Sequence, residues 1–380
     1  MTATSHVDPR CYVALELSQA KWLVGALLPK RAKIILHTVQ GGDAAGLVEV
    51  LEKVSARASN EAGTQVPLSV CYEIGYDGFW LARYLIDRGI DTHVLDSSSF
   101  RVSRRGRRAK TDRIDVEAMA VTLRAFMAGD KGACREVAIP EPEVEDAKRM
   151  SRERTQLARE RTRHVNRIRG LLTLHGIRHV KGIWGGEWRS ALKGLVTADG
   201  RRLGPFLCAE LAREFERLHL LLGHMKQLEA ERRAATATAT AFPSAPKVRL
   251  LVTLAGVGEI GATVLVTEVF HRSFKNRRHL ASYLGLTPSP YASGKSSREQ
   301  GISKAGNKPA RTLLVELAWC WLRYQPDSGL AEWYRRTYGE HSSRVRKVGI
   351  VALARKLAIA LWRFVEHGVV PAGAVMGPAR

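Results

Sequence analysis

Short apolar runs separated by turn-forming residues occupy the first 130 positions of the chain. Runs of four to eight mostly apolar residues bounded by turns are typical of strands, and apolar residues that recur every three to four positions are typical of helices. The pattern predicts strands at residues 12–17, 22–28, 33–39, 66–72 and 91–95, and helices at residues 43–58, 78–88 and 111–128.

This order of elements carries information about the fold. Three strands in succession, followed by alternating helices and strands, is the order found in RNase H-like sheets. In such a sheet the first and fourth strands are neighbours. We therefore expect an RNase H/RuvC-like mixed sheet with helices over residues 1–135.

Beyond residue 142 the pattern becomes helical. Residues 144–174 predict one long helix dense in Arg and Glu, and residues 206–233 predict a second, with apolar residues at helical spacing. The two are expected to pair as a long antiparallel, coiled-coil-like arm over residues 140–242. The Ala-Thr run at 234–241 is expected to be the linker that leads out of this arm. Residues 245–380 are expected to form a third, mostly helical domain.

Charge narrows the class of protein. The chain has 380 residues with 60 Lys and Arg against 37 Asp and Glu, a formal net charge of +23. Such an excess suits a protein that lies along phosphates, because each neutralised phosphate releases counterions. Ribosomal and membrane-surface proteins share this balance, so charge favours a nucleic-acid partner without establishing one.

The distribution of apolar residues and cysteines also predicts a cytoplasmic protein. No apolar run approaches the roughly 20 residues of a membrane span, and residues 1–9 are polar and lack the core of a signal peptide. The cysteines lie far apart, without a C-x-x-C pair, which indicates reduced and mostly buried thiols: Cys11, Cys71, Cys134, Cys208 and Cys320.

Four acidic residues are placed where they can converge. Glu16 and Glu73 end strands that are neighbours in an RNase H-like sheet, and Asp112 and Asp115 share one face at the start of a helix. Converging carboxylates repel unless a cation lies among them, and Mg²⁺ prefers such oxygen ligands. Two such ions can activate a nucleophile and stabilise the leaving oxygen of a phosphodiester.

A structural interpretation competes with this one. An Asp at a helix start is commonly a cap, so Asp112 and Asp115 can simply complement the helix dipole. Glu16 fits that view less well, since an acid inside an apolar strand is costly without a partner. A basic loop directly before the helix favours a nuclease, with the loop on the DNA backbone and the acids on the metal. Its alternative is an ordinary solvated loop. The expected DNA-contacting residues of the loop are Arg104, Arg105, Arg107, Arg108 and Lys110.

Two features of the last third can contact phosphate. Gly256 and Gly258 precede an apolar helix, and such turns either present free N–H groups to phosphate or are plain tight turns. Residues 291–295 predict a small-residue loop in which Ser293 lies beside Lys295 and Arg298. A serine in a loop is usually just a turn residue, because its hydroxyl is a weak nucleophile until a base or metal acts on it.

Several motifs together resemble a known family. Tyr12-Val-Ala-Leu-Glu-Leu-Ser, Tyr72-Glu-Ile-Gly-Tyr-Asp-Gly and Lys110-Thr-Asp-Arg-Ile-Asp stand in the order of the DEDD motifs. Leu254-Ala-Gly-Val-Gly, the stretch at 283–294 and Gly301-Ile-Ser-Lys-Ala-Gly-Asn are similar to C-terminal transposase signatures. The chain thus resembles, from about residue 10 to 365, transposases of the insertion sequence 110 family, with the 1111 subgroup included. One departure is Glu16, where the family usually has Asp.

The resemblance implies a mechanism and partners. Ser293 matches the family's catalytic serine, which forms a covalent phosphoserine link with DNA, while the acidic cluster of a partner subunit holds Mg²⁺ at the scissile phosphate. Lys304 and Arg311 are then phosphate contacts. The family further implies donor and target DNA, a structured guide (bridge) RNA encoded beside the gene, and a homodimer that pairs into a tetramer on nucleic acid in a bacterial cytoplasm, at the nucleoid.

Rival functions remain open at this stage. A RuvC-like endonuclease that hydrolyses DNA junctions with metal-activated water needs the acids but not Ser293. A nucleic-acid-binding protein without enzymatic activity needs neither. Tyrosine-recombinase chemistry fits poorly, because no Arg-His-Arg-Tyr set stands out among so many arginines.

Overall fold

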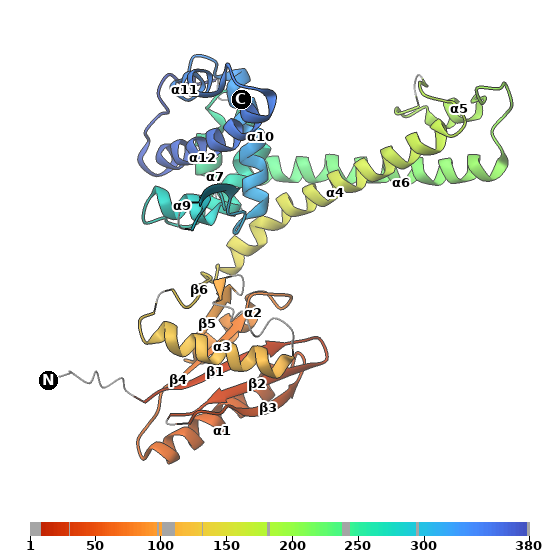
Figure 1. The fold of residues 1–380 in the computed structure, drawn as a ribbon. Coiled ribbons are helices and arrows are strands. Elements are labelled where there is room, and N and C mark those ends of the chain that lie inside the picture. The colour runs from red at the N-terminus through yellow and green to blue at the C-terminus, as the bar shows by residue number, and fades with distance from the viewer. Residues whose placement is uncertain are drawn as a thin grey trace. The chain divides into compact units, whose positions relative to one another are not determined.

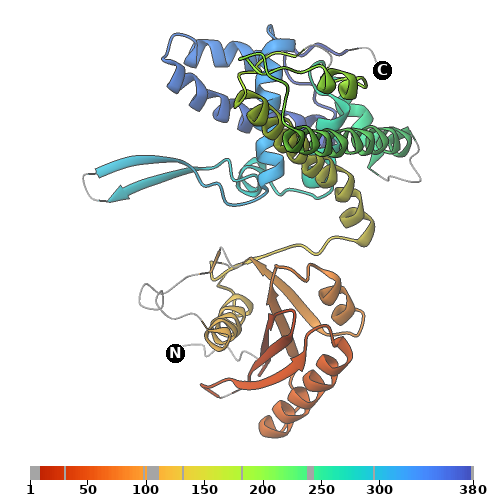
Figure 2. The same ribbon diagram turned by 90° about the vertical axis from the view of Figure 1, so that its right-hand side faces the viewer.

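A computed structural model describes residues 9–29, 31–96, 99–100, 111–130, 132–180, 183–237, 244–293 and 296–377, with side chains left undescribed at 290–300. The chain forms two compact units, Met1–Glu141 and Pro142–Arg380. Each unit is described separately (Figures 1 and 2). Within the described ranges, no helix combines the length and the apolar character that crossing a membrane requires.

The first unit is built on one six-stranded mixed sheet. Its spatial order is β3-β2-β1-β4-β5-β6, with β1 parallel to β4, β4 parallel to β5, and the other neighbours antiparallel. The five predicted strands are confirmed within a few residues, and the short β6 was not predicted. The strands are β1 (Cys11–Leu17), β2 (Lys21–Leu27), β3 (Ile35–Gln40), β4 (Leu68–Glu73), β5 (Asp91–Asp96) and β6 (Arg135–Glu136).

Helices cover both faces of this sheet, as Figure 2 shows from the side. One face packs against α1 (Ala44–Ala62) and α2 (Trp80–Ile86) around a core that includes Val13 and Leu15. The opposite face packs against α3 (Asp112–Met127) around Tyr12 and Ala14. Alternate residues of a strand point to opposite faces, so β1 contributes to both cores. The mixed α/β prediction is confirmed and is consistent with an RNase H-like domain.

The cysteines behave as predicted. All five are free, and Cys11, Cys71 and Cys134 are buried. Burial raises the pKa of the Cys11 thiol to about 12 and that of Cys71 further still, where the charge of Cys134 adds to the effect. These thiols are therefore protonated and unreactive at neutral pH.

The second unit begins with two long helices that run in opposite directions. They are α4 (Pro142–Thr173) and α6 (Pro205–Ala237), and Figure 1 shows them side by side with the short α5 (Trp188–Lys193) at their far end. The ion pairs Arg154–Glu229 and Arg167–Glu210 establish the antiparallel register. Helix α6 continues through Ala237, so the predicted linker at 234–241 is wrong for its first four residues. Ala has the highest helix propensity, and the buried Thr236 packs there.

The rest of the second unit is a helical body with one hairpin. Its apolar core lies among six helices, which are α7 (Ala245–Val252), α8 (Glu259–Leu265), α9 (Arg277–Tyr283), α10 (Lys308–Tyr324), α11 (Gly329–Tyr338) and α12 (Ser343–His367). Helix α8 runs on into a π-helical turn, η3 (Val266–Phe270). Strands β7 (Pro288–Ser293) and β8 (Ser296–Ile302) form the antiparallel hairpin that projects from this body in Figure 2.

Candidate functional site: an acidic sheet edge and a serine hairpin

Glu16 and Glu73 lie at matching ends of neighbouring strands. The parallel register of β1 and β4 pairs Leu15 with Tyr72, and Glu16 and Glu73 are the next residue of each strand. Glu16 is half-buried and Glu73 is exposed. Both line an open hollow together with Gly75, Tyr76 and Asp77. The adjacency expected from the order of elements is therefore present in the fold.

Helix α3 covers the same face of the sheet. Ala14 and Cys71 pack beneath α3, and Glu16 and Glu73 each follow two residues later on the same side of their strands. A Cβ atom added to Gly25 would lie only 2.0 Å from Cγ1 of Val116, so the first turns of α3 press directly on β2. Gly25 pairs with Ala14 in the sheet, which brings the start of α3 close to the rows that carry the two glutamates.

The start of α3 is capped by a residue other than the aspartates. Thr111 is the N-cap, and its hydroxyl accepts a hydrogen bond from the Ile114 N–H at 3.4 Å. Asp112 is exposed and Asp115 is half-buried in the first turn. Both still complement the helix dipole, but neither is needed as the side-chain cap.

The described carboxylates do not form a closed cage, and the hollow beside Glu16 and Glu73 is not lined by Asp112 or Asp115. In the described part of the chain, no three His, Cys, Asp or Glu side chains stand close enough together to hold a metal ion. Mutual repulsion of like charges is a sufficient reason for such spacing. The donor set itself, carboxylate oxygens on two adjacent strand ends beside a helix start, fits the hard-oxygen preference of Mg²⁺.

Two neighbours of this edge were not singled out from the sequence. Tyr76 is fully exposed, and burial raises the pKa of the Asp77 carboxyl. Both lie in the Tyr72-Glu-Ile-Gly-Tyr-Asp-Gly motif, which was the available signal. The predicted DNA-contacting residues Arg104, Arg105, Arg107, Arg108 and Lys110 lie outside the described residues.

Ser293 lies at the end of a strand, where a loop was predicted. It is the last residue of β7 and pairs in register with Ser296 of β8. The hairpin sequence is polar and has no alternating apolar face. Because its strands are paired through backbone hydrogen bonds, the sequence carries no hydrophobic alternation from which they could be predicted. The register shifts between Pro288 and Pro290, as proline in a strand requires an edge or a bulge. Of the neighbouring residues, Lys295 is not described, and Arg298 is placed only by its backbone, opposite Tyr291.

The base of this hairpin is tied to a buried acid that sequence reasoning missed. Glu268 is 2% exposed and lies in the π-helical turn η3. Asn307 donates from Nδ2 to Glu268 Oε2 at 3.0 Å, and the Tyr283 hydroxyl donates to the Glu268 carbonyl at 2.8 Å. Both partners belong to the motifs that flank the hairpin, so Glu268 joins the two ends of the segment that carries Ser293. An acid inside an apolar helix was the available signal.

Two basic residues of α4 face the same acid. Arg152 donates to Glu268 through Nε at 2.9 Å, and Lys148 is 9% exposed nearby. Burial raises the pKa of Glu268, but hydrogen bonds from Arg152 and Asn307 and the charges of Arg152 and Lys148 together outweigh it, so the net shift is downward. Burial also lowers the pKa of Lys148, against the opposing charge of Glu268. The acid is thus held ionised as part of the packing.

The remaining predicted phosphate contacts have structural partners nearby. Arg311 donates to the Leu284 carbonyl at 3.1 Å, and the Lys304 backbone N–H donates to the Gly285 carbonyl at 3.2 Å, with the Lys304 side chain exposed. Gly256 has φ of +85° and packs against Tyr324. Gly258 is the N-cap of α8, whose first turn contains the acidic Glu259. This geometry is that of a packed turn, although it leaves the phosphate prediction untested.

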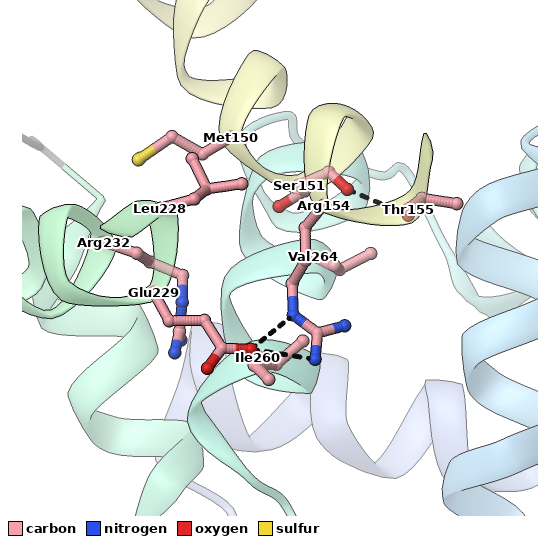
Figure 3. A pocket seen from close by; sticks show the side chains of 9 residues that line it. All are labelled: Met150, Ser151, Arg154, Thr155, Leu228, Glu229, Arg232, Ile260 and Val264. Carbon is pink, nitrogen blue, oxygen red and sulfur yellow. Dashed lines mark hydrogen bonds and ion pairs between the residues drawn. The ribbon is translucent and has the colours of Figure 1, made fainter. Parts of the chain in front are cut away.

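A small hollow marks the joint between the helical pair and the body of the second unit (Figure 3). Arg154 of α4 pairs there with Glu229 of α6 at 3.1 Å, and Ile260 and Val264 of α8 close one side. Its volume of about 30 Å³ has room for about one water molecule. The buried Arg232 lies 3.4 Å from Glu259. This joint fixes the helices and is too small for an organic ligand.

Comparisons with known proteins bear on the identity of the chain. A family model described as "Transposase", for the DEDD domain, matches residues 18–177, and one described as "Transposase IS116/IS110/IS902 family" matches residues 248–333. The chain is 43% identical over 373 residues to "Putative transposase y4rJ" of Sinorhizobium fredii, covering 96% of this chain and 94% of that protein. It is also 28% identical to "Transposase for insertion sequence element IS1111A" of Coxiella burnetii, covering 73% and 71%.

Proposed function

Because the chain belongs to the IS110 family of insertion-sequence transposases, we propose that it cuts and rejoins DNA through a covalent link between Ser293 and a DNA phosphate. The acidic edge, made of Glu16, Glu73, Asp112 and Asp115, is proposed to hold Mg²⁺ in the same reaction. The observation that carries this is the register of β1 and β4, which puts two glutamates side by side under the helix that begins with two aspartates.

Each group has a defined task in this scheme. Mg²⁺, when bound, polarises a phosphoryl oxygen and stabilises the leaving oxygen. The Ser293 hydroxyl loses its proton, its oxygen forms a bond to phosphorus, and the bond from phosphorus to one deoxyribose oxygen breaks. That oxygen gains a proton and leaves as a hydroxyl. Attack by another hydroxyl reverses the exchange and releases the serine, so the phosphodiester energy is conserved and no ATP is required.

The hairpin suits such a nucleophile. Ser293 ends β7, five residues after Pro288, while Asn307 and Tyr283 fix the two flanking segments on Glu268. A nucleophile on a supported element can approach a phosphodiester in a controlled direction, which lowers the entropic part of the barrier. Lys295, Arg298, Lys304 and Arg311 are proposed to contact DNA phosphates around it, with the 104–110 loop doing so beside the acids.

The proposed partners follow from the same scheme. Donor and target DNA are the substrates, at the nucleoid of a bacterial cytoplasm, and a structured guide RNA is the proposed selector of sites. Two strands at each of two sites need several active centres, so a dimer that pairs into a tetramer on nucleic acid is proposed. The antiparallel pair α4 and α6 is proposed as a coiled-coil-like arm for this assembly. Light scattering that found only monomer in the reconstituted complex would contradict it.

A serine series tests the nucleophile. Ser293→Ala is expected to abolish recombination in cells and to remove the covalent protein–DNA adduct seen after denaturing electrophoresis of labelled DNA. The matched controls Ser296→Ala, Ser297→Ala and Ser303→Ala remove a hydroxyl from the same hairpin region and are expected to keep the adduct. Recombination that survives Ser293→Ala would instead support a RuvC-like nuclease that uses water. A nucleic-acid-binding protein without enzymatic activity would instead show no recombination in the wild type, and its DNA binding would be unchanged by Asp112→Asn with Asp115→Asn.

A further inference from the structure

A hollow at the far end of the helical pair has no role in the proposed chemistry. It has a volume of about 660 Å³, within the range of about 300–1,000 Å³ usual for small-ligand sites. Leu172, Ile177 and Ile183 line it and belong to the small apolar core at this end of the arm. This core fixes the floor of the hollow independently of the helical body.

One wall of the hollow is an aromatic ring that remains open to solvent. Trp184 lines the hollow and is 40% exposed, although large aromatic side chains usually bury most of their surface. The ring centroid lies 5.9 Å from that of Phe215, and the Arg169 guanidinium lies 5.4 Å from the Trp184 centroid. An aromatic ring next to an arginine plane is the arrangement on which nucleobases stack.

The other lining groups add positive charge. Arg169, Arg178 and His179 line the hollow, and no Asp or Glu is among its described lining residues. Two other arginines of the arm, Arg154 and Arg167, are paired with glutamates. No described residue forms an ion pair or a hydrogen bond with the side chain of Arg178 or His179. The hollow therefore attracts anions without competition from an internal partner.

We propose that this hollow binds an unpaired nucleotide of a single-stranded nucleic acid. The base stacks on Trp184, and the adjacent phosphates pair with Arg169 and Arg178. A paired base in a duplex cannot reach the ring, because it is already stacked between its neighbours. An acidic peptide would pair with Arg169 and Arg178 but would provide no planar group to stack on the Trp184 ring. The inference takes from the proposed function only that the chain handles nucleic acid.

Binding of the full-length protein to short fluorescent single strands tests the site. Trp184→Ala is expected to weaken binding about tenfold, in keeping with the loss of one stacked base, while Trp184→Phe keeps a stacking ring and most of the affinity. The same measurement on strands whose bases are replaced by abasic residues removes the stacking partner but keeps the phosphates. There, Trp184→Ala is expected to have no effect.

A charge control separates the pocket from general attraction. Arg159 is exposed on α4, outside the hollow, and Arg159→Gln removes the same charge as Arg178→Gln. The pocket predicts the larger loss for Arg178→Gln. RNA and DNA strands are compared in parallel, and a Trp184-dependent loss with either or both supports the site and identifies its ligand.

The proposal is overturned if Trp184→Ala weakens intact and abasic strands equally, or if Arg159→Gln and Arg178→Gln have equal effects. Thermal melting of each variant shows whether the apolar core at this end of the arm stays folded. If Trp184→Ala unfolds it, Trp184→Phe is used in its place. The same binding measurements in a Ser293→Ala background keep this test separate from the proposed catalysis, since a failed serine mechanism would leave the Trp184 effect unchanged.

Discussion

Glu16 and Glu268 are acids in similar apolar surroundings along the chain, yet the fold treats them in opposite ways. Glu16 is the last but one residue of β1 and is half-exposed, with another carboxylate beside it on β4 and an open hollow in front. Glu268 is 2% exposed, with Arg152 and Asn307 as hydrogen-bond donors. An arrangement that concentrates like charges at an opening suits the binding of a cation, whereas one that satisfies a buried charge suits packing.

The difference teaches how to separate catalytic acids from positioning acids. A large cost in stability is expected where an acid is buried among hydrogen-bond donors, and a smaller cost is expected where it borders an open hollow. Recombination activity should show the opposite order: it should fall more when an acid of the acidic edge is replaced than when Glu268 is replaced. The variants below break or sharpen this contrast, beginning with the largest effect.

Removing a carboxylate of the acidic edge should abolish activity and spare the fold. Asp115→Asn or Glu73→Gln is expected to lower recombination by about 10³-fold or more, since metal-assisted stabilisation supplies several kcal/mol of the barrier reduction. Unfolding free energy should stay within about 0.5 kcal/mol of wild type, as for most surface substitutions. Recombination assays and urea titrations measure the two quantities. An equal loss of both would mean that the edge is structural.

Neutralising Glu268 should act on stability first. Glu268→Gln is expected to lower the unfolding free energy by about 2 kcal/mol, because the buried Lys148 loses its opposing charge and the donors of Asn307 and Arg152 lose their best acceptor. Urea titration measures the change. The matched control is Glu16→Gln, which changes a half-buried acid at an open hollow and should therefore cost less stability than Glu268→Gln. Equal destabilisation by both variants would remove the contrast between the two acids.

A methyl group under α3 should shift the helix that carries Asp115. Gly25→Ala introduces a Cβ that would lie 2.0 Å from Val116 Cγ1, and overpacking of this kind costs about 1–3 kcal/mol. Recombination should fall with it, since Asp115 adjoins Val116. Adding Val116→Ala removes the clashing atom and should recover part of both losses. A double-mutant cycle measured by urea titration detects this coupling, and strictly additive losses would contradict it.

A smaller effect concerns pH. Burial and the nearby charges of Lys148 and Arg272 lower the pKa of His271 to about 4, against an ordinary value near 6.5. The unfolded chain therefore binds a proton between these values that the folded chain does not. The contribution of His271 to stability is present above about pH 6.5 and is lost as the pH falls toward 4. Replacing it in His271→Gln should flatten the dependence of unfolding free energy on pH over that window, and an unchanged slope would contradict the assignment.

Local signals predicted the first unit well. Turn residues bound its short strands, and alternation or apolar runs identify them, so strand positions and their order were readable. The two long helices of the second unit were also readable, the first as a long run dense in Arg and Glu and the second from apolar residues that recur at helical spacing. The hairpin at 288–302 was missed, since a polar two-stranded ladder is held by backbone hydrogen bonds that leave no side-chain pattern.

The sequence by itself determined the elements, the basic character and the candidate residues Glu16, Glu73, Asp112, Asp115 and Ser293, because these depend on local composition and spacing. Only the tertiary structure decided that β1 and β4 align Glu16 with Glu73, that Gly25 admits α3 above them, and that Glu268 is buried against Arg152 and Asn307. Asn307 lies 39 residues from Glu268 along the chain, and Arg152 lies 116 residues from it. Such contacts depend on chain packing, which no local pattern encodes.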